Sequence, residues 1–193
     1  DKYLQIVINE TDRLTKLTNS LLTLNNLNTK GMILEKTDFD INEVIRNTVA
    51  SFEGTCKTKM IGVEIVLTGD EMLVVADQGR IQQVIYNLLD NAIKFSHNNS
   101  VIKVETTEKK NKIFISIKDN GIGIPKEDVK MIWDRFYKSD SSRGKDKKGT
   151  GLGLSIVKEI INAHNENINV ISTLGAGTEF IFSLQKSAKN EED

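Results

Sequence analysis

Hydrophobic side chains recur every three or four positions over the first 27 residues, the spacing of one face of an α-helix. A helix of that length extends about 40 Å and has no core of its own, so its leucines need a partner. Packing against the rest of the chain is one solution. The length of the stripe favours a dimerising coiled coil or helical bundle. The stripe consists of Leu4, Val7, Thr11, Leu14, Leu17, Leu21, Leu24 and Leu27.

After this helix, which we expect to end at Lys30-Gly31, the pattern becomes shorter and more extended. Met32 to Lys36 is predicted to be a short extended stretch. Asp40 to Glu43 has the sequence of a capping box and predicts a helix start. Two apolar runs, Ile61–Leu67 and Met72–Ala76, flank Thr68-Gly69-Asp70 and predict a β-hairpin.

Two further strand pairs are predicted from alternation of apolar and polar residues. Val101–Thr106 should pair with Lys112–Lys118. Ile168–Ser172 should pair with Thr178–Leu184 across a glycine-containing turn. The polar tail from Ser187 to Asp193 is expected to be disordered.

A helix from about Gln78 to Phe95 divides its residues into two faces. At about 100° per residue, Asn91 lies about 40° from Asn87, and Lys94 about 20° from Asn87 on its other side. These three polar side chains therefore share one stripe. The opposite side is apolar and suited to packing on a sheet; it contains Val84, Ile85, Leu88, Ala92 and Ile93.

Composition removes several classes of function. The 193 residues carry 26 Lys+Arg and 27 Asp+Glu, a formal net charge of -1, whereas a general nucleic-acid binder is distinctly basic. One cysteine and two histidines exclude a disulfide framework and make a multi-cysteine zinc site or a histidine metal centre unexpected. No apolar run approaches the roughly 18 residues of a membrane span, and the charged start is not a signal peptide. We therefore expect a protein of a reducing compartment that is not inserted in a membrane.

The polar stripe of the Gln78–Phe95 helix has a chemical interpretation. Asn87 and Asn91 offer neutral amide oxygens to a hard cation such as Mg²⁺, which keeps several waters when phosphates complete its coordination. Lys94, one turn further, offers a point charge to a phosphate. The alternative is an ordinary solvated helix face.

Two glycine-rich segments add to this picture. Asp119 to Pro125 directly follows a predicted strand, and its glycines permit close approach of a ligand, although the segment could be a simple turn. Gly149 to Leu154 leads into an amphipathic helix, whose N-terminal amides favour phosphate. The spacing fits neither the dinucleotide fingerprint nor a Walker loop. Between them, Lys138 to Lys148 is a polar, basic run that is either a solvated loop or a lid over phosphates.

Four blocks in this order resemble the N, G1, F and G2 boxes of bacterial sensor histidine kinases: Asn87–Phe95, Asp119–Gly123, Trp133–Tyr137 and Gly149–Leu154. The resemblance implies a two-layer α/β sandwich, a mixed β-sheet covered by helices (the Bergerat-type ATP-binding fold), preceded by a long N-terminal helix. Residues 31–186 would be the catalytic ATP-binding domain and 187–193 a disordered tail. Residues 1–30 resemble the second helix of the dimerisation and phosphoacceptor hairpin.

The same resemblance implies ATP and Mg²⁺ as ligands and a role for each matched residue. Asn87 and Asn91 would contact Mg²⁺ and phosphates, and Asp119 the adenine amino group, supported by Thr178. Phe136 and Tyr137 would anchor the lid. Lys138 stands where many relatives carry arginine. The implied catalytic residues are Asn87, Lys94 and Lys138, and the implied nucleotide-binding residues are Asn87, Asn91, Lys94, Phe95, Asp119, Gly121, Gly123, Ile124, Tyr137, Lys138, Gly149, Gly151, Leu152, Gly153, Leu154 and Thr178.

The phosphoacceptor histidine of that family is missing from the sequence. His97 is expected in a surface loop, and His164 at a helix end, where protonated histidine can complement the C-terminus. The acceptor would be a histidine on the first hairpin helix, upstream of Asp1. This chain would bind ATP without phosphorylating itself, and the onward partner would be an aspartate of a response regulator. The resemblance implies that this chain is cytoplasmic and that the parent is a homodimer anchored in the cell membrane by upstream segments.

Two other functions compete with this interpretation. Many of the related gyrase-type, MutL-type and Hsp90-type ATPases carry a glutamate at the place of Asn87, and that glutamate activates water. An amide cannot act as a base, so hydrolysis should be slow and transfer to histidine favoured. A nucleotide-binding adaptor without activity is the remaining alternative.

Overall fold

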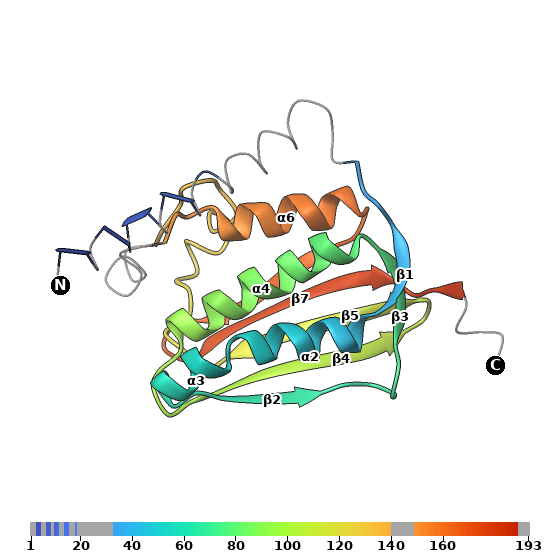
Figure 1. The fold of residues 1–193 in the computed structure, drawn as a ribbon, viewed down its shortest axis with the longest axis horizontal. Helices are drawn as coiled ribbons and strands as arrows, with labels where there is room; N and C mark the ends of the chain where they lie inside the picture. The colour runs from blue at the N-terminus through green and yellow to red at the C-terminus, as the bar shows by residue number, and fades with distance from the viewer. Residues whose placement is uncertain are drawn as a thin grey trace.

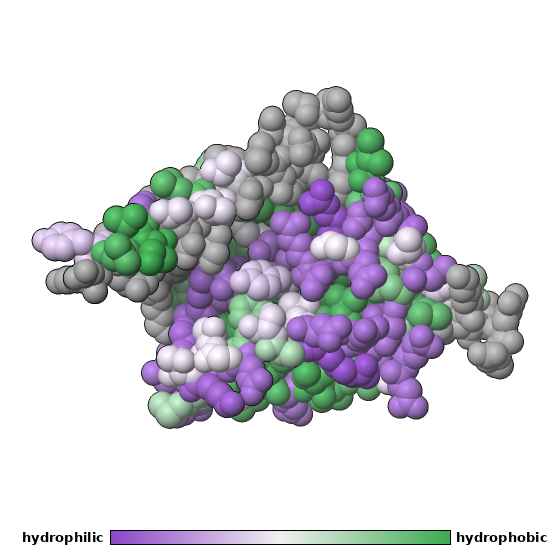
Figure 2. Space-filling view, in the orientation of Figure 1, coloured by the Kyte–Doolittle hydropathy of each residue, from purple (hydrophilic) through white to green (hydrophobic). Residues whose placement is uncertain are grey.

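The structure is a computed structural model. It describes residues 33–139 and 149–188, together with separate positions between Tyr3 and Thr18. Those N-terminal positions are helical, and the hydroxyls of Thr11 and Thr18 donate to carbonyls one turn earlier. Their hydrophobic side chains are exposed, as the green cluster on this segment shows (Figure 2). The later stripe positions, Leu17 to Leu27, and the predicted end at Lys30-Gly31 lie outside the described residues.

A five-stranded mixed sheet forms one layer, with the strand order β2-β4-β5-β7-β6. Only β2 and β4 are parallel; the other neighbours are antiparallel. Both later strand pairs predicted from the sequence are therefore confirmed. The bounds are β2 Gly62–Val66, β4 Val101–Lys109, β5 Lys112–Asp119, β6 Ile168–Thr173 and β7 Gly177–Gln185.

Three helices cover one face of this sheet, with α4 between α2 and α6 (Figure 1). Their apolar sides and the inward residues of the strands form one core. This is the expected two-layer α/β sandwich. The helices are α2 Ile41–Ser51, α4 Gln78–Phe95 and α6 Gly153–Ala163, and a short helix α3, Glu53–Lys59, follows α2.

A second, two-stranded sheet corrects the predicted hairpin. β3 (Leu73–Ala76) pairs antiparallel with β1 (Thr37–Asp40), whereas β2 pairs with β4 in the large sheet. The runs Ile61–Leu67 and Met72–Ala76 thus lie in different sheets and do not form a hairpin. Of the extended stretch predicted at Met32–Lys36, Met32 lies outside the described residues, and residues 33–36 precede the first strand, which begins at Thr37.

Buried polar contacts account for the separation of β2 from β3. The side-chain amide of Asn42, fully buried on α2, donates to the carbonyls of Thr68 and Gly69 at 3.3 and 3.4 Å. Oδ1 of Asp40 caps α2 through the N–H of Asn42 and also accepts from the N–H of Met72, both at 2.9 Å. The segment between the strands is therefore bound to the start of α2, which directs β3 toward β1.

The end of the large sheet is tied to the same small sheet. The N–H of Ser187 donates to the carbonyl of Leu73 at 2.9 Å, and its hydroxyl donates to Asp38 at 2.6 Å. Ser187 is buried, so it is held in place rather than being the first residue of a disordered tail. Among the described residues, no helix has the length and apolar character needed to cross a membrane.

Candidate nucleotide-binding site

Helix α4 presents one polar side next to its buried apolar side. Asp77 caps its start by accepting the N–H of Arg80 at 3.0 Å, and the helix continues to Phe95, as predicted. The apolar positions predicted to pack on the sheet are all buried. Asn87, Asn91 and Lys94 remain partly exposed and share the other side of the helix.

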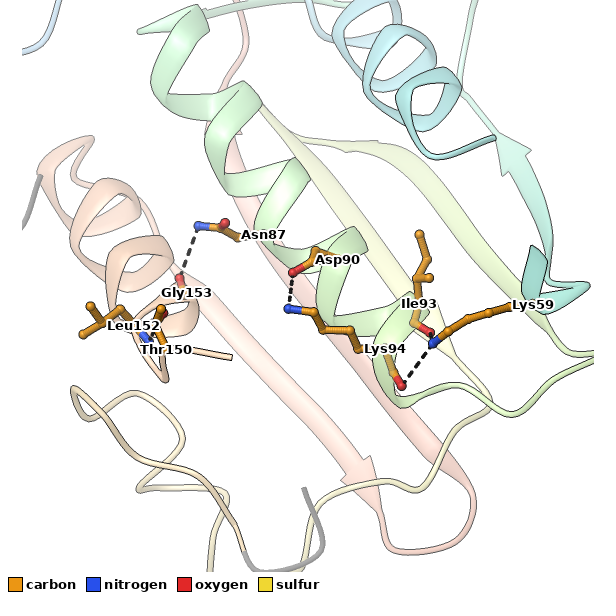
Figure 3. Close-up of polar contacts among 8 residues, drawn as sticks. All are labelled: Lys59, Asn87, Asp90, Ile93, Lys94, Thr150, Leu152 and Gly153. Atoms are coloured by element: carbon orange, nitrogen blue, oxygen red, sulfur yellow. Dashed lines mark hydrogen bonds and ion pairs between the residues drawn. The ribbon is translucent and has the colours of Figure 1, made fainter. Parts of the chain in front are cut away.

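The polar side of α4 faces the glycine-rich turn before α6 (Figure 3). Nδ2 of Asn87 donates to the carbonyl of Gly153 at 3.4 Å. The ammonium of Lys94 pairs with Asp90, one turn earlier, at 2.6 Å. Both side chains of this ion pair are about a third exposed, so the pair borders solvent. The structure thus brings the first and fourth predicted blocks together.

The turn at Gly149–Leu152 packs closely against the rest of the protein through Gly151 and Leu152. Thr150 accepts the N–H of Leu152 at 3.3 Å, and the Leu152 side chain is fully buried. Leu152, predicted to bind nucleotide, can therefore contribute only through its backbone. Gly151 has φ +71°, and a Cβ there would lie 2.9 Å from the backbone of Phe136. At Gly153, the nearest atom to an added Cβ is Cγ of Asn87 at 3.9 Å, so the protein itself leaves room there.

The second glycine segment starts at a buried carboxylate. Asp119 ends β5, is 5% exposed, and accepts the N–H of Gly121 at 2.8 Å. Burial raises the pKa of this carboxyl above its ordinary 3.8, although backbone N–H groups of Gly121 and Thr178 oppose the shift. A buried acceptor of this kind suits a neutral donor such as an exocyclic amine.

The glycines after Asp119 allow backbone contacts that no side chain could tolerate. A Cβ at Gly121 would lie 2.4 Å from the carbonyl oxygen of Phe95. At Gly123, with φ +68°, it would lie 2.0 Å from the carbonyl oxygen of Thr173. The loop is therefore packed between the end of α4 and the turn that joins β6 to β7. Ile124, the next predicted residue, is partly buried against the core.

Thr178 lies opposite Asp119 in the pairing of β5 with β7, as the predicted supporting role requires. Its hydroxyl lies 2.8 Å from that of Ser172, which also accepts the N–H of Ile124 at 2.8 Å. Ser172 was not predicted from the sequence. Ser172 connects Thr178 on β7 to the glycine loop, and no local sequence motif indicates this connection.

The third predicted block, Trp133–Tyr137, contributes mainly hydrophobic packing. Trp133 meets Phe180 edge-to-face at a centroid distance of 5.8 Å, and Tyr137 packs against the core. Phe136 is 60% exposed, so its side chain does not anchor this region; its N–H donates to the carbonyl of Gly151 at 2.9 Å. Lys138 is partly buried, and most of the predicted lid, residues 140–148, lies outside the described residues.

The predicted metal ligands, Asn87 and Asn91, offer amide oxygens from the partly exposed side of α4. In residues 33–139 and 149–188, and at the described N-terminal positions, no group of three or more His, Cys, Asp or Glu side chains could hold a metal. The amides of Asn87 and Asn91 instead fit Mg²⁺ that takes its other oxygens from phosphates and water. Ser96, directly after α4, has a buried hydroxyl without a hydrogen-bond partner in the described part of the chain. The donor set therefore fits a magnesium nucleotide.

Neither histidine has the surroundings of a phosphoacceptor on a hairpin helix. His97 is exposed after α4, as predicted. His164 does end α6, but the prediction of a protonated ring is corrected: Nε2 accepts the N–H of Asp77 at 3.0 Å, so it carries no proton. The proton is on Nδ1, 2.8 Å from the carbonyl of Ile160. Burial lowers the pKa of this ring.

The chain matches known proteins over this region and beyond it. The family model described as "Histidine kinase-, DNA gyrase B-, and HSP90-like ATPase" matches residues 76–188. Sensor histidine kinase WalK of Bacillus subtilis is 35% identical over 196 residues that cover 100% of this chain and 32% of WalK. Sensor histidine kinase YclK of the same organism is also 35% identical, over 99% of this chain and 40% of YclK. The chain thus spans less than half the length of these relatives.

The solved structures similar to this chain are also histidine kinases. The catalytic domain of histidine kinase ThkA aligns with a TM-score of 0.70 and 33% identity, covering 79% of this chain and 96% of that one. A structure of ThkA in complex with response regulator protein TrrA aligns with a TM-score of 0.78 and 30% identity, covering 100% of this chain and 52% of that one.

Proposed function

The chain belongs to the family of histidine kinase-, DNA gyrase B- and HSP90-like ATPases, and on that premise we propose that it is the catalytic end of a two-component sensor histidine kinase. ATP binding follows from the family. The finer proposal is that residues 31–186 hold ATP with Mg²⁺ and transfer its γ-phosphoryl group to a histidine on another helix. The similarity to WalK and YclK supports this choice within the family.

One relationship carries the proposal: the side chain of Asn87 and the carbonyl of Phe95, both on α4, contact the two glycine segments. Asn87 contacts the carbonyl of Gly153, and the carbonyl of Phe95 accepts the N–H of Ile122 at 3.2 Å. Ile122 and Gly153, which are 31 residues apart in the sequence, therefore both contact α4. A nucleotide bound there can be contacted at its base by one glycine segment and at its phosphates by the other.

Each group has a defined task in this proposal. The buried carboxylate of Asp119 accepts a hydrogen bond from the adenine amino group, and Thr178 supports it. Lys94 exchanges its contact with Asp90 for a phosphate oxygen, and the first amides of α6 add donors. Asn87 and Asn91 offer their amide oxygens to Mg²⁺, which neutralises phosphate charge when it is bound. Lys138, by its charge, acts near the γ-phosphate.

The amide at position 87 decides between transfer and hydrolysis. Asn87 has no basic group with which to take a proton from water, so the site orients the phosphates without activating a water nucleophile. Phosphoryl transfer needs little more than positioning and charge neutralisation. We therefore propose that the acceptor histidine supplies the nucleophile and that ATP hydrolysis alone is slow.

Partners of the whole protein are part of the same proposal. The N-terminal helix exposes Leu4, Val7 and Leu14, which supports a role in helix pairing, and we propose that it belongs to the dimerisation hairpin of a homodimer. The onward acceptor would be an aspartate of a response regulator. ThkA, which aligns over the full chain, has been solved with such a protein.

The test has two stages. ATP binding is measured by calorimetry with and without Mg²⁺, using Asp119→Asn as a non-binding control. Labelled ATP is then mixed with a separately expressed hairpin that carries the acceptor histidine of the same protein. We expect label on the hairpin, lost on acid treatment. Rapid phosphate release without the hairpin would identify an ATPase instead, and binding without transfer would identify an adaptor.

A further inference from the structure

The last turn of α4 is held by a lysine from a different helix. Nζ of Lys59, the last residue of α3, donates to the carbonyl of Ile93 at 2.7 Å and lies 3.5 Å from that of Lys94 (Figure 3). Both carbonyls belong to the final turn, where helix geometry provides no intrahelical donor. A cation at this position also complements the negative end of the helix dipole. Lys59 thus acts as a C-terminal cap of α4 that is supplied by a different helix of the same chain.

The same turn supports the glycine loop on its other side. The carbonyl of Phe95 accepts the N–H of Ile122, and Gly121 lies so close to this oxygen that a Cβ would be 2.4 Å away. The carboxylate that opens the loop, Asp119, accepts the N–H of Gly121. A shift of the last turn of α4 would therefore move the backbone that orients Asp119.

Lys59 is itself held in a defined place. α3 ends in a left-handed cap at Met60, with φ 55°, whose N–H donates to the carbonyl of Lys57 at 3.1 Å. The N–H of Ile61 donates to the carbonyl of Cys56 at 2.9 Å, and Cys56 is buried in the core. The end of α3 is therefore fixed, and Lys59 reaches α4 from a rigid support.

We propose that Lys59 is a positioning residue for base recognition: it fixes the last turn of α4 and, through Phe95, the loop that holds Asp119. It does not touch the nucleotide. This inference rests on the proposed function, because it assumes that Asp119 receives the adenine amino group. It adds a residue outside all four sequence blocks, on a helix that takes no part in the site.

The helix offers a matched control. Lys57 lies two residues earlier on α3, is largely exposed, and pairs with Glu53 at 3.1 Å. Replacing it removes the same charge from the same helix without touching α4. Lys59→Arg keeps a cation that can reach the carbonyls, whereas Lys59→Met keeps the length of the side chain without the donor.

The experiment measures base discrimination. Affinities for ATP and for inosine triphosphate, which carries an oxygen in place of the adenine amino group, are measured in Mg²⁺ by competition with a fluorescent ATP analogue. We expect Lys59→Met to lower the preference for ATP about three- to tenfold, the size of effect that one ordinary hydrogen bond contributes. Lys59→Arg should restore most of it, and Lys57→Met should equal the wild type.

Two results would overturn the inference. One is an unchanged preference in Lys59→Met. The other is a proportional loss of both affinities that follows a fall in unfolding temperature, since this would reveal support of the fold alone. Failure of the wild type to bind ATP would be distinguishable from these, because it would overturn the proposed function itself and with it the inference.

Discussion

The main-chain N–H of Asp77 donates to Nε2 of His164 at 3.0 Å, which joins the start of α4 to the end of α6. Oδ2 of Asp77 also accepts the N–H of Glu35 at 3.1 Å, from the segment before β1. Only a neutral His164, protonated on Nδ1, can accept the hydrogen bond from Asp77. Charged groups that act on this ring are Lys36, which disfavours protonation, and Asp77 and Glu166, which favour it.

We predict that His164 makes stability depend on pH in the mildly acidic range. Burial lowers its pKa in the folded protein below the ordinary 6.5, so its contribution is present above that value and is lost as pH falls through the lowered pKa. The unfolding temperature of the wild type should fall from about pH 7 to about pH 5 more steeply than that of His164→Gln. Thermal melts across this range compare the two slopes, and equal slopes would contradict the prediction.

The pKa of Asp119 is shifted in the opposite direction to that of His164: folding favours the protonated carboxyl, so its effect on stability changes with pH in the opposite sense to that of His164. Its pKa is raised in the folded protein, so its contribution to stability is present below the ordinary 3.8 and is lost as pH rises through the raised pKa. At neutral pH the ionised carboxylate therefore costs stability. Asp119→Asn should stabilise the nucleotide-free protein while removing ATP binding. Melts without nucleotide and calorimetry with ATP measure both; a less stable mutant would show that the carboxylate contributes more through its hydrogen bonds than burial costs.

Asn91 should be needed for metal-dependent affinity and not for the fold. Its side of α4 is not in the core, so Asn91→Ala should keep the wild-type unfolding temperature. The gain in ATP affinity caused by Mg²⁺ should disappear, a loss of about tenfold or more if one metal contact contributes about 1.4 kcal/mol. Gln82→Ala, at an exposed position of the same helix, is the control. Calorimetric titrations with and without Mg²⁺ decide, and a full Mg²⁺ effect in Asn91→Ala would count against the assigned metal site.

Gly151 and Gly153 should respond differently to alanine. At Gly151 the positive φ and the 2.9 Å approach to Phe136 predict a loss of about 1–2 kcal/mol or more. At Gly153, the first residue of α6, the fold has room, and alanine should be neutral or stabilising by up to about 1 kcal/mol. Denaturant melts of the two variants test this pair, and similar losses in both would refute it.

Elements with local signals were predictable from the sequence. The bounds of α4 follow from the cap at Asp77 and the apolar period to Ile93, which need no knowledge of the rest of the fold. The pairs β4–β5 and β6–β7 likewise join neighbours in sequence through short turns. The predicted hairpin of β2 with β3 failed because Thr68-Gly69-Asp70 is only a local turn signal. The outcome depends on Asn42, 26 residues earlier, which binds the carbonyl of Thr68.

The site divides in the same way. Asn87, Asp119 and the glycines could be selected by residue type and spacing, and the structure brings their segments together. Ser172 and Lys59 could not, because serine in a strand and lysine in a helix are ordinary residues until a partner distant in sequence is known. The side-chain exposure of Phe136 and its φ of +63° were also beyond sequence reasoning, since no local pattern indicates either.

The hydrogen bonds of Ser187 to Leu73 and Asp38 have a consequence for how this domain can be connected to others. The first described strand of the domain, β1, and its last described buried residue, Ser187, therefore lie next to each other. A short glycine bridge could join the two ends, and new termini could be opened at the Lys110-Asn111 turn without stretching any strand. A module fused after Ser187 would begin beside the segment that leads in from the N-terminal helix.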